Sequence, residues 1–257
     1  MKVNFKKFFL VVSCMMIQSS FFSNKESNSL ETNSSNPRII SIPYNTNQDG
    51  IVFGCEAVSA TMVLRFYGYY IDEFDFTDNY LIQRDFSYSD DSRICEGSDP
   101  NYAYPGNSYK DTGLNQGFGI FGSGLTASLN KFFDKNEKLH IAKNTTGMSL
   151  KDLITNYIDK GKPVIFWATM GMKKSSEGKS WIINFTDENS PYKEGDEYTW
   201  YRCEHCLVLV GYDEEYYYFN DSLNEDILTK YEKKLVEQRF LEMGKNSVVV
   251  LPVKSES

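Results

Sequence analysis

Histidine is scarce in this chain, which holds only His140 and His205 among its 257 residues. A hydrolase that pairs a cysteine nucleophile with a histidine base must therefore use one of these two. Zinc sites are constrained as well, because Cys203 and Cys206 form the single CxxC pair, and no second pair of cysteines or histidines completes a site. We expect no metal and no cofactor.

Long apolar runs are also lacking. The run at Phe8–Ile17 is well short of the roughly 20 residues that cross a bilayer as a helix, so we expect no membrane-spanning segment in the mature chain. Three lysines precede this run, and that order is typical of a secretory signal peptide. We therefore predict a signal peptide at residues 1–23 and a flexible linker, rich in Ser and Asn, at residues 24–37.

The mode of export has an alternative. Val11–Cys14 resembles a lipobox, in which Cys14 would carry a lipid anchor, but the apolar residues that follow Cys14 disfavour this. On either interpretation we expect the mature protein to lie outside the cytoplasm, secreted or associated with the cell surface.

Positive charge is in short supply, with 27 Lys and Arg against 35 Asp and Glu and a net charge of -8. This balance argues against nucleic acid or an anionic membrane as the main partner. Hydrophobic residues make up 41% of the chain, which is enough for an ordered core. We predict one domain at residues 38–257.

Hydrophobic patterning predicts the order of the elements. Helices are expected at residues 55–68, 124–136, 150–160 and 230–243, and strands at 38–44, 163–170, 205–210, 216–220 and 247–253. Helices come first and antiparallel strands later, which favours an α+β fold with the helices on one side of a sheet. Residues 72–116 lack a regular pattern, so we expect a functional loop or unrecognised short elements there.

Cys55 is the candidate nucleophile because it begins a predicted helix directly after Gly54. A helix N-terminus carries partial positive charge, which favours a thiolate, and its free N–H groups can stabilise an oxyanion. The alternative is that Cys55 is a small buried residue on the apolar face of the helix.

His205 is the better of the two candidate bases, since it begins a strongly apolar strand where a polar residue needs a reason. His140 has no evident acidic partner, and we interpret it as a structural or surface residue. A hairpin turn centred on Asp213 would place Asp221 directly opposite His205 on the same face, where the carboxylate could orient the ring. A register shift of one residue would separate the two.

Gln48 lies in the loop that leads into the Cys55 helix. Its side-chain amide could donate to an oxyanion beside the backbone N–H of Cys55. The same residue could equally be an ordinary loop residue.

The sequence resembles a family, the papain-like cysteine peptidases of the double-glycine-leader type, in their stand-alone secreted branch. The similar segments are IPY at 42–44, GCEAVSATM at 54–62, YPG at 104–106, GFGI at 117–120, GKPV at 161–164, EHCLVLVGYD at 204–213 and FND at 219–221. The resemblance implies a papain-like fold, with the nucleophile helix packed against an antiparallel sheet. It also implies roles for the four candidates, namely Cys55 as nucleophile, His205 as base, Asp221 as its orienting acid and Gln48 as oxyanion donor.

The function expected from these residues is secreted hydrolysis of peptide bonds in a peptide or protein substrate, through a thioester intermediate. Two alternatives stay open: cell-wall peptide cleavage or transglutaminase-like acyl transfer by the same triad, and a non-catalytic binding module on the same scaffold. Outside the cytoplasm, a disulfide between Cys95 and Cys203 is also allowed.

Overall fold

The computed structural model describes residues 37–46, 50–89, 94–136 and 139–253. The predicted signal peptide, nearly all of the predicted linker, Cys14 and Gln48 lie outside the described residues. Within those ranges, no helix combines the length and the apolar character that a membrane crossing needs.

The helices are α1 (Cys55–Phe66), α2 (Glu73–Asn79), α3 (Gly122–Lys135), α4 (Leu150–Asn156) and α5 (Lys233–Glu242), with short 3-10 turns at Ile158–Lys160 and Met170–Met172. The strands are β1 (Arg38–Ile39), β2 (Gln83–Arg84), β3 (Ser87–Tyr88), β4 (Cys95–Ser98), β5 (Tyr104–Pro105), β6 (His140–Asn144), β7 (Val164–Thr169), β8 (Ser176–Phe185), β9 (Glu197–Arg202), β10 (Glu204–Tyr212), β11 (Tyr216–Asn220), β12 (Thr229–Glu232) and β13 (Ser247–Pro252). The predicted α+β class is confirmed.

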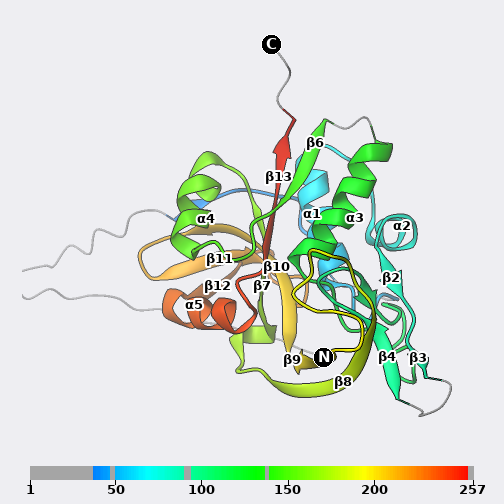
Figure 1. Ribbon diagram of the computed structural model, residues 1–257. Helices are drawn as coiled ribbons and strands as arrows, with labels where there is room; N and C mark the ends of the chain where they lie inside the picture. Colours follow the sequence, from blue (N-terminus) through cyan, green and yellow to red (C-terminus); the bar gives the residue numbers. More distant parts are fainter. Residues whose placement is uncertain (1–36, 47–49, 90–93, 137–138, 254–257) are drawn as a thin grey trace, which may run out of the picture. The chain divides into compact units, whose positions relative to one another are not determined.

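The main sheet is antiparallel and runs in the order β12-β11-β10-β7-β13-β6, with β1 added beside β10. Helices cover both of its faces, α1 and α3 on one and α4 and α5 on the other (Figure 1). The prediction that all helices lie on one side is therefore wrong. The sequence of β7 already indicated cover on both faces, because its residues do not alternate between apolar and polar. In the structure, β7 is buried at every position.

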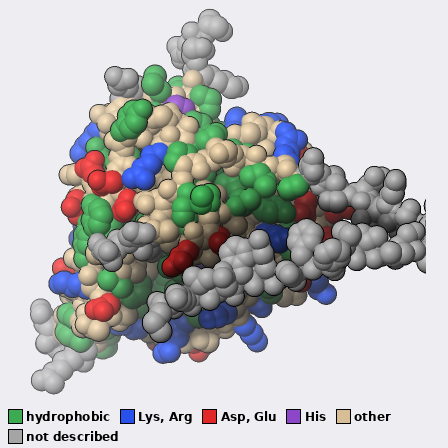
Figure 2. Space-filling model, turned by 180° about the vertical axis from the view of Figure 1, so that it is seen from behind, with side chains coloured by type: hydrophobic (Ala, Val, Ile, Leu, Met, Phe, Trp, Pro, Cys, Tyr) green, Lys and Arg blue, Asp and Glu red, His purple; other side chains and the backbone are tan. Residues whose placement is uncertain are grey.

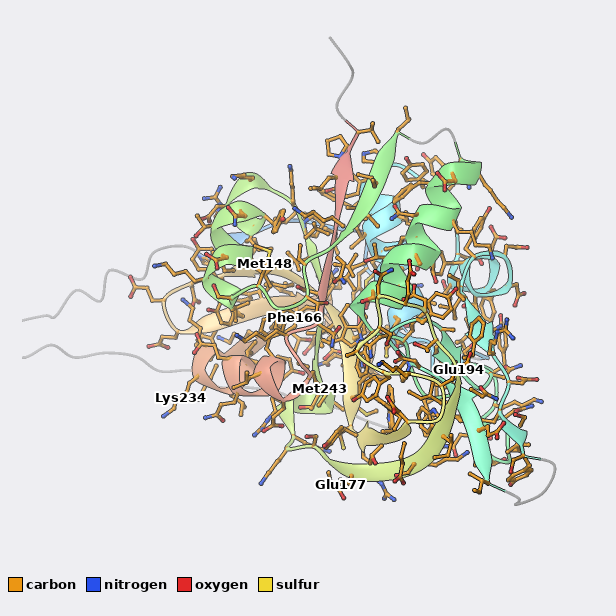
Figure 3. All side chains as sticks on the ribbon, viewed as in Figure 1. Met148, Phe166, Glu177, Glu194, Lys234 and Met243 are labelled. Carbon is orange, nitrogen blue, oxygen red and sulfur yellow. The ribbon has the colours of Figure 1, made fainter. Side chains whose placement is uncertain are left out.

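Side chains from alternate positions of β10 enter the two cores. Cys206 and Val208 face α1, whereas Leu207 and Leu209 face α4 and α5. Phe166 of β7 stacks on Phe240 of α5 with ring centroids 4.3 Å apart. Figure 3 shows Phe166 in the interior of the molecule and the side chains of charged residues such as Lys234 directed outward.

Helix α1 begins where the sequence predicts. Gly54 precedes it, and a Cβ at this position would lie only 2.2 Å from the Ile51 side chain, so a larger residue would displace the chain that enters the helix. The helix ends before Gly68, whose φ of 89° is a left-handed conformation that glycine adopts at little cost. Cys55 is thus fixed at the first position of a helix that packs on β10.

The irregular stretch at residues 72–116 contains short elements, which was one of the two alternatives expected for it. Helix α2 lies there with β2, β3, β4 and β5, strands of only two to four residues that are too short to give a period-two pattern. Strands β3, β4, β8 and β9 form a second sheet around a small aromatic core that includes Phe86, Trp181 and Trp200.

The chain passes from the second sheet into the main sheet at Cys203, between β9 and β10. Cys203 has a φ of 64°, and its carbonyl accepts a hydrogen bond from the backbone N–H of Met170. This sharp connection places the end of β9 beside the start of β10, which carries Glu204 and His205.

Charged side chains of both signs are interspersed with apolar ones on the face of the molecule drawn in Figure 2. The negative balance of the sequence is therefore not gathered into a single patch on that face.

Candidate active site

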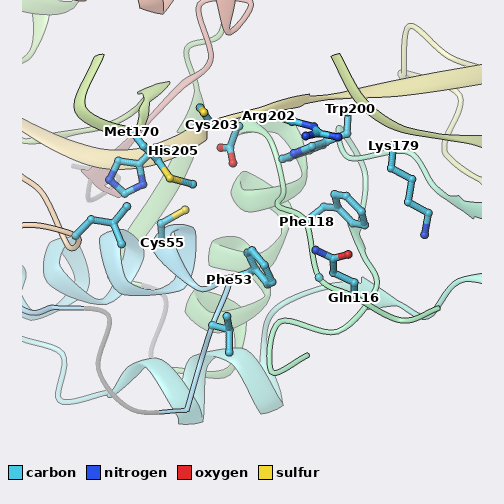
Figure 4. A pocket seen from close by; sticks show the side chains of 15 residues that line it. Phe53, Cys55, Gln116, Phe118, Met170, Lys179, Trp200, Arg202, Cys203 and His205 are labelled. Carbon is cyan, nitrogen blue, oxygen red and sulfur yellow. The ribbon is translucent and has the colours of Figure 1, made fainter. Parts of the chain in front are cut away.

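A cavity of about 340 Å³ lies at the N-terminal end of α1. It is lined by Cys55, the first residue of α1, and by His205, the second residue of β10. Figure 4 shows the two side chains on one side of the cavity, with Gln116, Phe118 and Lys179 on the other. The fold thus brings together two of the sequence candidates that lie 150 positions apart in their numbering.

His205 and Asp221 form a buried pair. The Nε2 atom of the ring lies 2.7 Å from Oδ1 of Asp221, and the two residues are only 1% and 3% exposed. The same carboxylate accepts hydrogen bonds from the backbone N–H of Leu223 and the hydroxyl of Tyr231. Burial alone would raise the pKa of Asp221, but the hydrogen bonds and the charge of His205 outweigh it, so this pKa is lowered.

The predicted register of the hairpin is wrong, although the contact that it predicted is present. Val208 pairs with Asn220, whereas a turn centred on Asp213 would pair Val208 with Tyr218. Next to the turn, the pairs are displaced by three residues from the predicted register, and a bulge between Leu209 and Gly211 takes one residue back. The remaining displacement of two residues is even, so the same side chains still share a face. Asp221 therefore still lies on the His205 face, just past the end of β11.

The orientation of His205 leaves one ring nitrogen for chemistry. Nε2 is engaged with Asp221, whereas Nδ1 is buried and has no hydrogen-bond partner. If Nε2 carries the proton that Asp221 accepts, Nδ1 holds a free lone pair. Nδ1 is thus the atom that can accept a proton from Cys55.

The Cys55 thiol is not bound to His205 in this structure. It donates to Oε2 of Glu56, with a distance of 3.3 Å between Sγ and the oxygen. Burial, followed by the negative charges of Glu56 and Glu204, raises the pKa of the thiol well above its usual range, and a hydrogen bond from the Cys206 backbone N–H opposes this only in part. In this arrangement, burial and two acidic neighbours therefore oppose the thiolate that the helix N-terminus is expected to favour.

Glu56 and Glu204 are site residues that the sequence reasoning missed. They are 1% and 5% exposed, and one ligand atom from each lies within 4.8 Å of the other and of Cys55 Sγ. Both oxygens of Glu56 already accept hydrogen bonds, Oε1 from the Ile120 N–H at 2.7 Å and Oε2 from Cys55. A thiol and two carboxyl groups at this spacing form a set that could bind a cation or retain a proton.

Burial raises the pKa of Glu56 to about 7, although hydrogen bonds from its own N–H, from Ile120 and from Cys55 oppose the rise. Burial, together with the charge of Glu56, raises the pKa of Glu204 well above its usual range. The signal that could have found Glu204 is the one that found His205, namely a polar residue at the head of an apolar strand.

A donor for an oxyanion lies at the start of α1. The first hydrogen bond of the helix runs from the Val58 N–H to the Gly54 carbonyl, so the N–H of Cys55 precedes the helical ladder. Gln48, the second candidate donor, lies outside the described residues, and its role stays a prediction.

His140 lies in a different part of the fold. Its Nδ1 is 2.8 Å from the hydroxyl of Tyr69, and its ring packs against Tyr67 and Phe133. Burial lowers its pKa. These contacts agree with the structural role expected for His140 and leave His205 as the histidine of the cavity.

The remaining described cysteines are free thiols, including Cys95 and Cys203. The disulfide that the sequence allowed is therefore not formed. Cys95 lies on β4 and Cys203 follows β9, and these strands lie on opposite sides of β8 in the second sheet. Two strand spacings exceed the reach of a disulfide. Cys206 is fully buried in the core beside α1, as expected from strand alternation, which directs it away from the His205 face.

Comparison with known proteins adds three findings. The model of the Peptidase C39-like family matches residues 39–248. A crystal structure of a Bacillus anthracis protein, provisionally described as a C39-like peptidase, superposes with a TM-score of 0.69 at 23% identity and covers 85% of this chain and 99% of its own. A double glycine motif protease from an AMS/PCAT transporter, solved with its leader peptide, gives a TM-score of 0.40 at 13% identity over 84% of this chain and 98% of its own. No curated protein matches the chain.

Proposed function

Because the chain belongs to the Peptidase C39-like family, we propose that it is a cysteine peptidase with Cys55, His205 and Asp221 as its catalytic triad. One observation carries this proposal: His205 is held by Asp221 through Nε2, keeps Nδ1 without a partner, and lines the same cavity as Cys55. A binding module would have no need of an imidazole with one nitrogen fixed and the other free.

The reaction begins when the Cys55 thiol turns from Glu56 towards His205. The proton passes from sulfur to Nδ1, and the thiolate attacks the carbonyl carbon of the scissile amide. The Cys55 N–H, with the Gln48 amide as the second donor, stabilises the oxyanion of the tetrahedral intermediate.

The intermediate collapses when the C–N bond breaks. The imidazolium of His205 gives its proton to the leaving amine, and a thioester forms on Cys55. Water then attacks the thioester with His205 as base and releases the acid. Asp221 keeps the ring in one tautomer and stabilises the imidazolium throughout.

The cavity indicates which part of a peptide it receives. Its apolar lining includes Phe53, Phe118, Met170 and Trp200, and Lys179 and Arg202 add positive charge. Such walls suit an apolar or aromatic side chain next to the scissile bond, with carboxylate groups tolerated nearby.

Export is proposed on the sequence pattern of residues 1–23, in which lysines precede a short apolar run. The mature chain then begins near residues 19–23, and mass spectrometry of the native protein tests this. An intact Met1 or a lipidated Cys14 would contradict simple cleavage.

Cleavage of a peptide library tests the proposed activity. Wild-type protein should release fragments, whereas Cys55→Ala and His205→Ala should reduce turnover by at least about a thousandfold. His140→Ala is the matched control, because it removes the other histidine of the chain. Equal turnover by Cys55→Ala and wild type would reject the proposal.

A further inference from the structure

The Cys55 thiol has two competing partners. Oε2 of Glu56 accepts its hydrogen bond at 3.3 Å, while Nδ1 of His205 has no partner. The proposed chemistry needs the second contact, and the structure shows the first. Glu56 therefore competes with His205 for the hydrogen bond of the nucleophile.

Glu56 is held rigidly in this position. The Ile120 N–H donates to Oε1 at 2.7 Å, and the backbone of Gly119 closes over the carboxyl groups. A Cβ on Gly119 would lie 2.4 Å from Oε1 of Glu56 and 3.0 Å from Oε2 of Glu204. The loop at residues 119–120 thus forms a cradle that fits these two side chains closely.

Glu204 supplies a second buried carboxyl to the same cradle. Its Oε1 has no hydrogen-bond partner, and neither Glu56 nor Glu204 takes part in an ion pair among the described residues. Two buried carboxylates at this distance cannot both be ionised, so the pair retains at least one proton. The other titratable groups around the pair are Cys206, Tyr104 and Tyr198, and the cavity adds Lys179, Arg202 and His205.

We propose that Glu56, with Glu204 as its proton-sharing partner, is a positioning residue that holds the Cys55 thiol in a resting state away from His205. The catalytic pair forms when the thiol gives up its bond to Glu56 and transfers its proton to Nδ1. The S–H bond breaks, an N–H bond forms on His205, and Glu56 loses one donor. This inference rests on the proposed function, since it concerns the same nucleophile.

The charge of the pair opposes formation of the thiolate. A negative carboxylate next to sulfur disfavours a second negative charge there, and replacing it with a neutral amide removes this repulsion. Glutamine has nearly the shape of glutamate and can still accept from the Ile120 N–H, so Glu56→Gln isolates the effect of charge. Glu204→Gln changes the partner and leaves the acceptor of the thiol bond in place.

The experiment measures the rate at which iodoacetamide labels Cys55 from pH 6 to pH 11, with peptide mass spectrometry identifying the cysteine. Wild type, Glu56→Gln, Glu204→Gln and the control Glu214→Gln are compared; Glu214 is exposed in the turn between β10 and β11. Glu56→Gln should lower the pH midpoint of labelling by about one unit or more and raise the rate at pH 8 by about tenfold, because Glu56 carries its negative charge above its pKa of about 7. Glu204→Gln should shift the midpoint in the same direction by a smaller amount, and Glu214→Gln should match wild type.

Midpoints for Glu56→Gln and Glu204→Gln that equal that of the control would overturn the inference, and so would a shift to higher pH. If EDTA alone shifts the wild-type midpoint, a bound cation and not a shared proton neutralises the pair, which also overturns it. If Glu56→Gln does not fold, Glu204→Gln alone decides the matter. Labelling of wild-type Cys55 that is slow and insensitive to His205→Ala instead refutes the proposed function itself.

Discussion

At the scale of single residues, the site consists of one thiol, one imidazole and three acids. Asp221 binds His205, whereas Glu56 and Glu204 lie beside Cys55. The environments of these acids shift their pKa values in opposite directions, down for Asp221 and up for the other two. The ring atom that lacks a partner is Nδ1 of His205, and this residue lines the same cavity as Cys55.

Asp221 fixes the tautomer of His205, and its replacement should show this. Asp221→Asn should lower kcat/KM by about a hundredfold to ten-thousandfold, because an amide can leave the ring in the wrong tautomer. Tyr231→Phe removes only the hydroxyl that binds the other oxygen of the same carboxylate and should cost about tenfold or less. Steady-state kinetics on one peptide measures both. A larger loss for Tyr231→Phe than for Asp221→Asn would contradict the role given to the acid.

The raised pKa of Glu56 predicts how stability depends on pH. Its pKa is raised from 4.5 to about 7, so between these values the folded protein binds more protons than the unfolded chain. The free energy of unfolding should therefore fall as pH rises from about 4.5 to about 7. Urea unfolding at several pH values measures this slope. Glu56→Gln should flatten it relative to Glu214→Gln, and an unchanged slope would show that Glu56 does not titrate in this range.

Glu204 also shows what sequence reasoning could reach at this scale. The rule that a polar residue in an apolar strand needs a reason identified His205, and it applies equally to its neighbour Glu204. The partnership with Glu56 was beyond reach, because it depends on how closely α1 and the loop at residues 119–120 approach β10.

At the scale of elements, the start of α1 and the strands β7 and β10 could be read from the sequence because their apolar patterns are long. The register between β10 and β11 could not, since the turn differs from the predicted one and a bulge beside Gly211 shifts the pairing again by one residue. Helices on both faces of the sheet were missed as well. Length and pattern predict that an element exists, but not which face of the sheet receives it.

The loop before α3 gives a test at this scale. Gly119→Ala should destabilise the protein by about 1–3 kcal/mol, because the added methyl group would push against the carboxyl groups of Glu56 and Glu204. Thermal unfolding followed by circular dichroism measures the loss. A variant as stable as wild type would show that the cradle is looser than the structure describes.

At the scale of the whole molecule, two sheets meet at Cys203, and the cavity lies where β9 passes into β10. The resemblance seen in the sequence and the family match at residues 39–248 agree on nearly all of the described chain. The path of the second sheet could not be predicted, because two of its four strands, β3 and β4, are too short to carry a pattern of their own.

The arrangement of the second sheet makes a prediction about redox state. Protein purified without reductant should yield both Cys95 and Cys203 as free thiols, since β8 separates their strands. Non-reducing digestion with mass spectrometry checks this, and addition of reductant should leave the thermal midpoint unchanged. A linked peptide pair that contains both cysteines would contradict the strand order.

The most direct test of the triad is to trap it with a peptide-like electrophile. A peptidyl vinyl sulfone with an apolar residue next to the warhead should modify Cys55 and not Cys203, as mapped by peptide mass spectrometry. Both thiols line the cavity with His205, but only Cys55 begins a helix there, where backbone N–H groups can stabilise a thiolate. His205→Ala should slow the modification by about a hundredfold or more at pH 7, while His140→Ala should leave it unchanged. Modification of Cys95 or Cys203 as fast as Cys55, or equal rates in His205→Ala and wild type, would contradict the account.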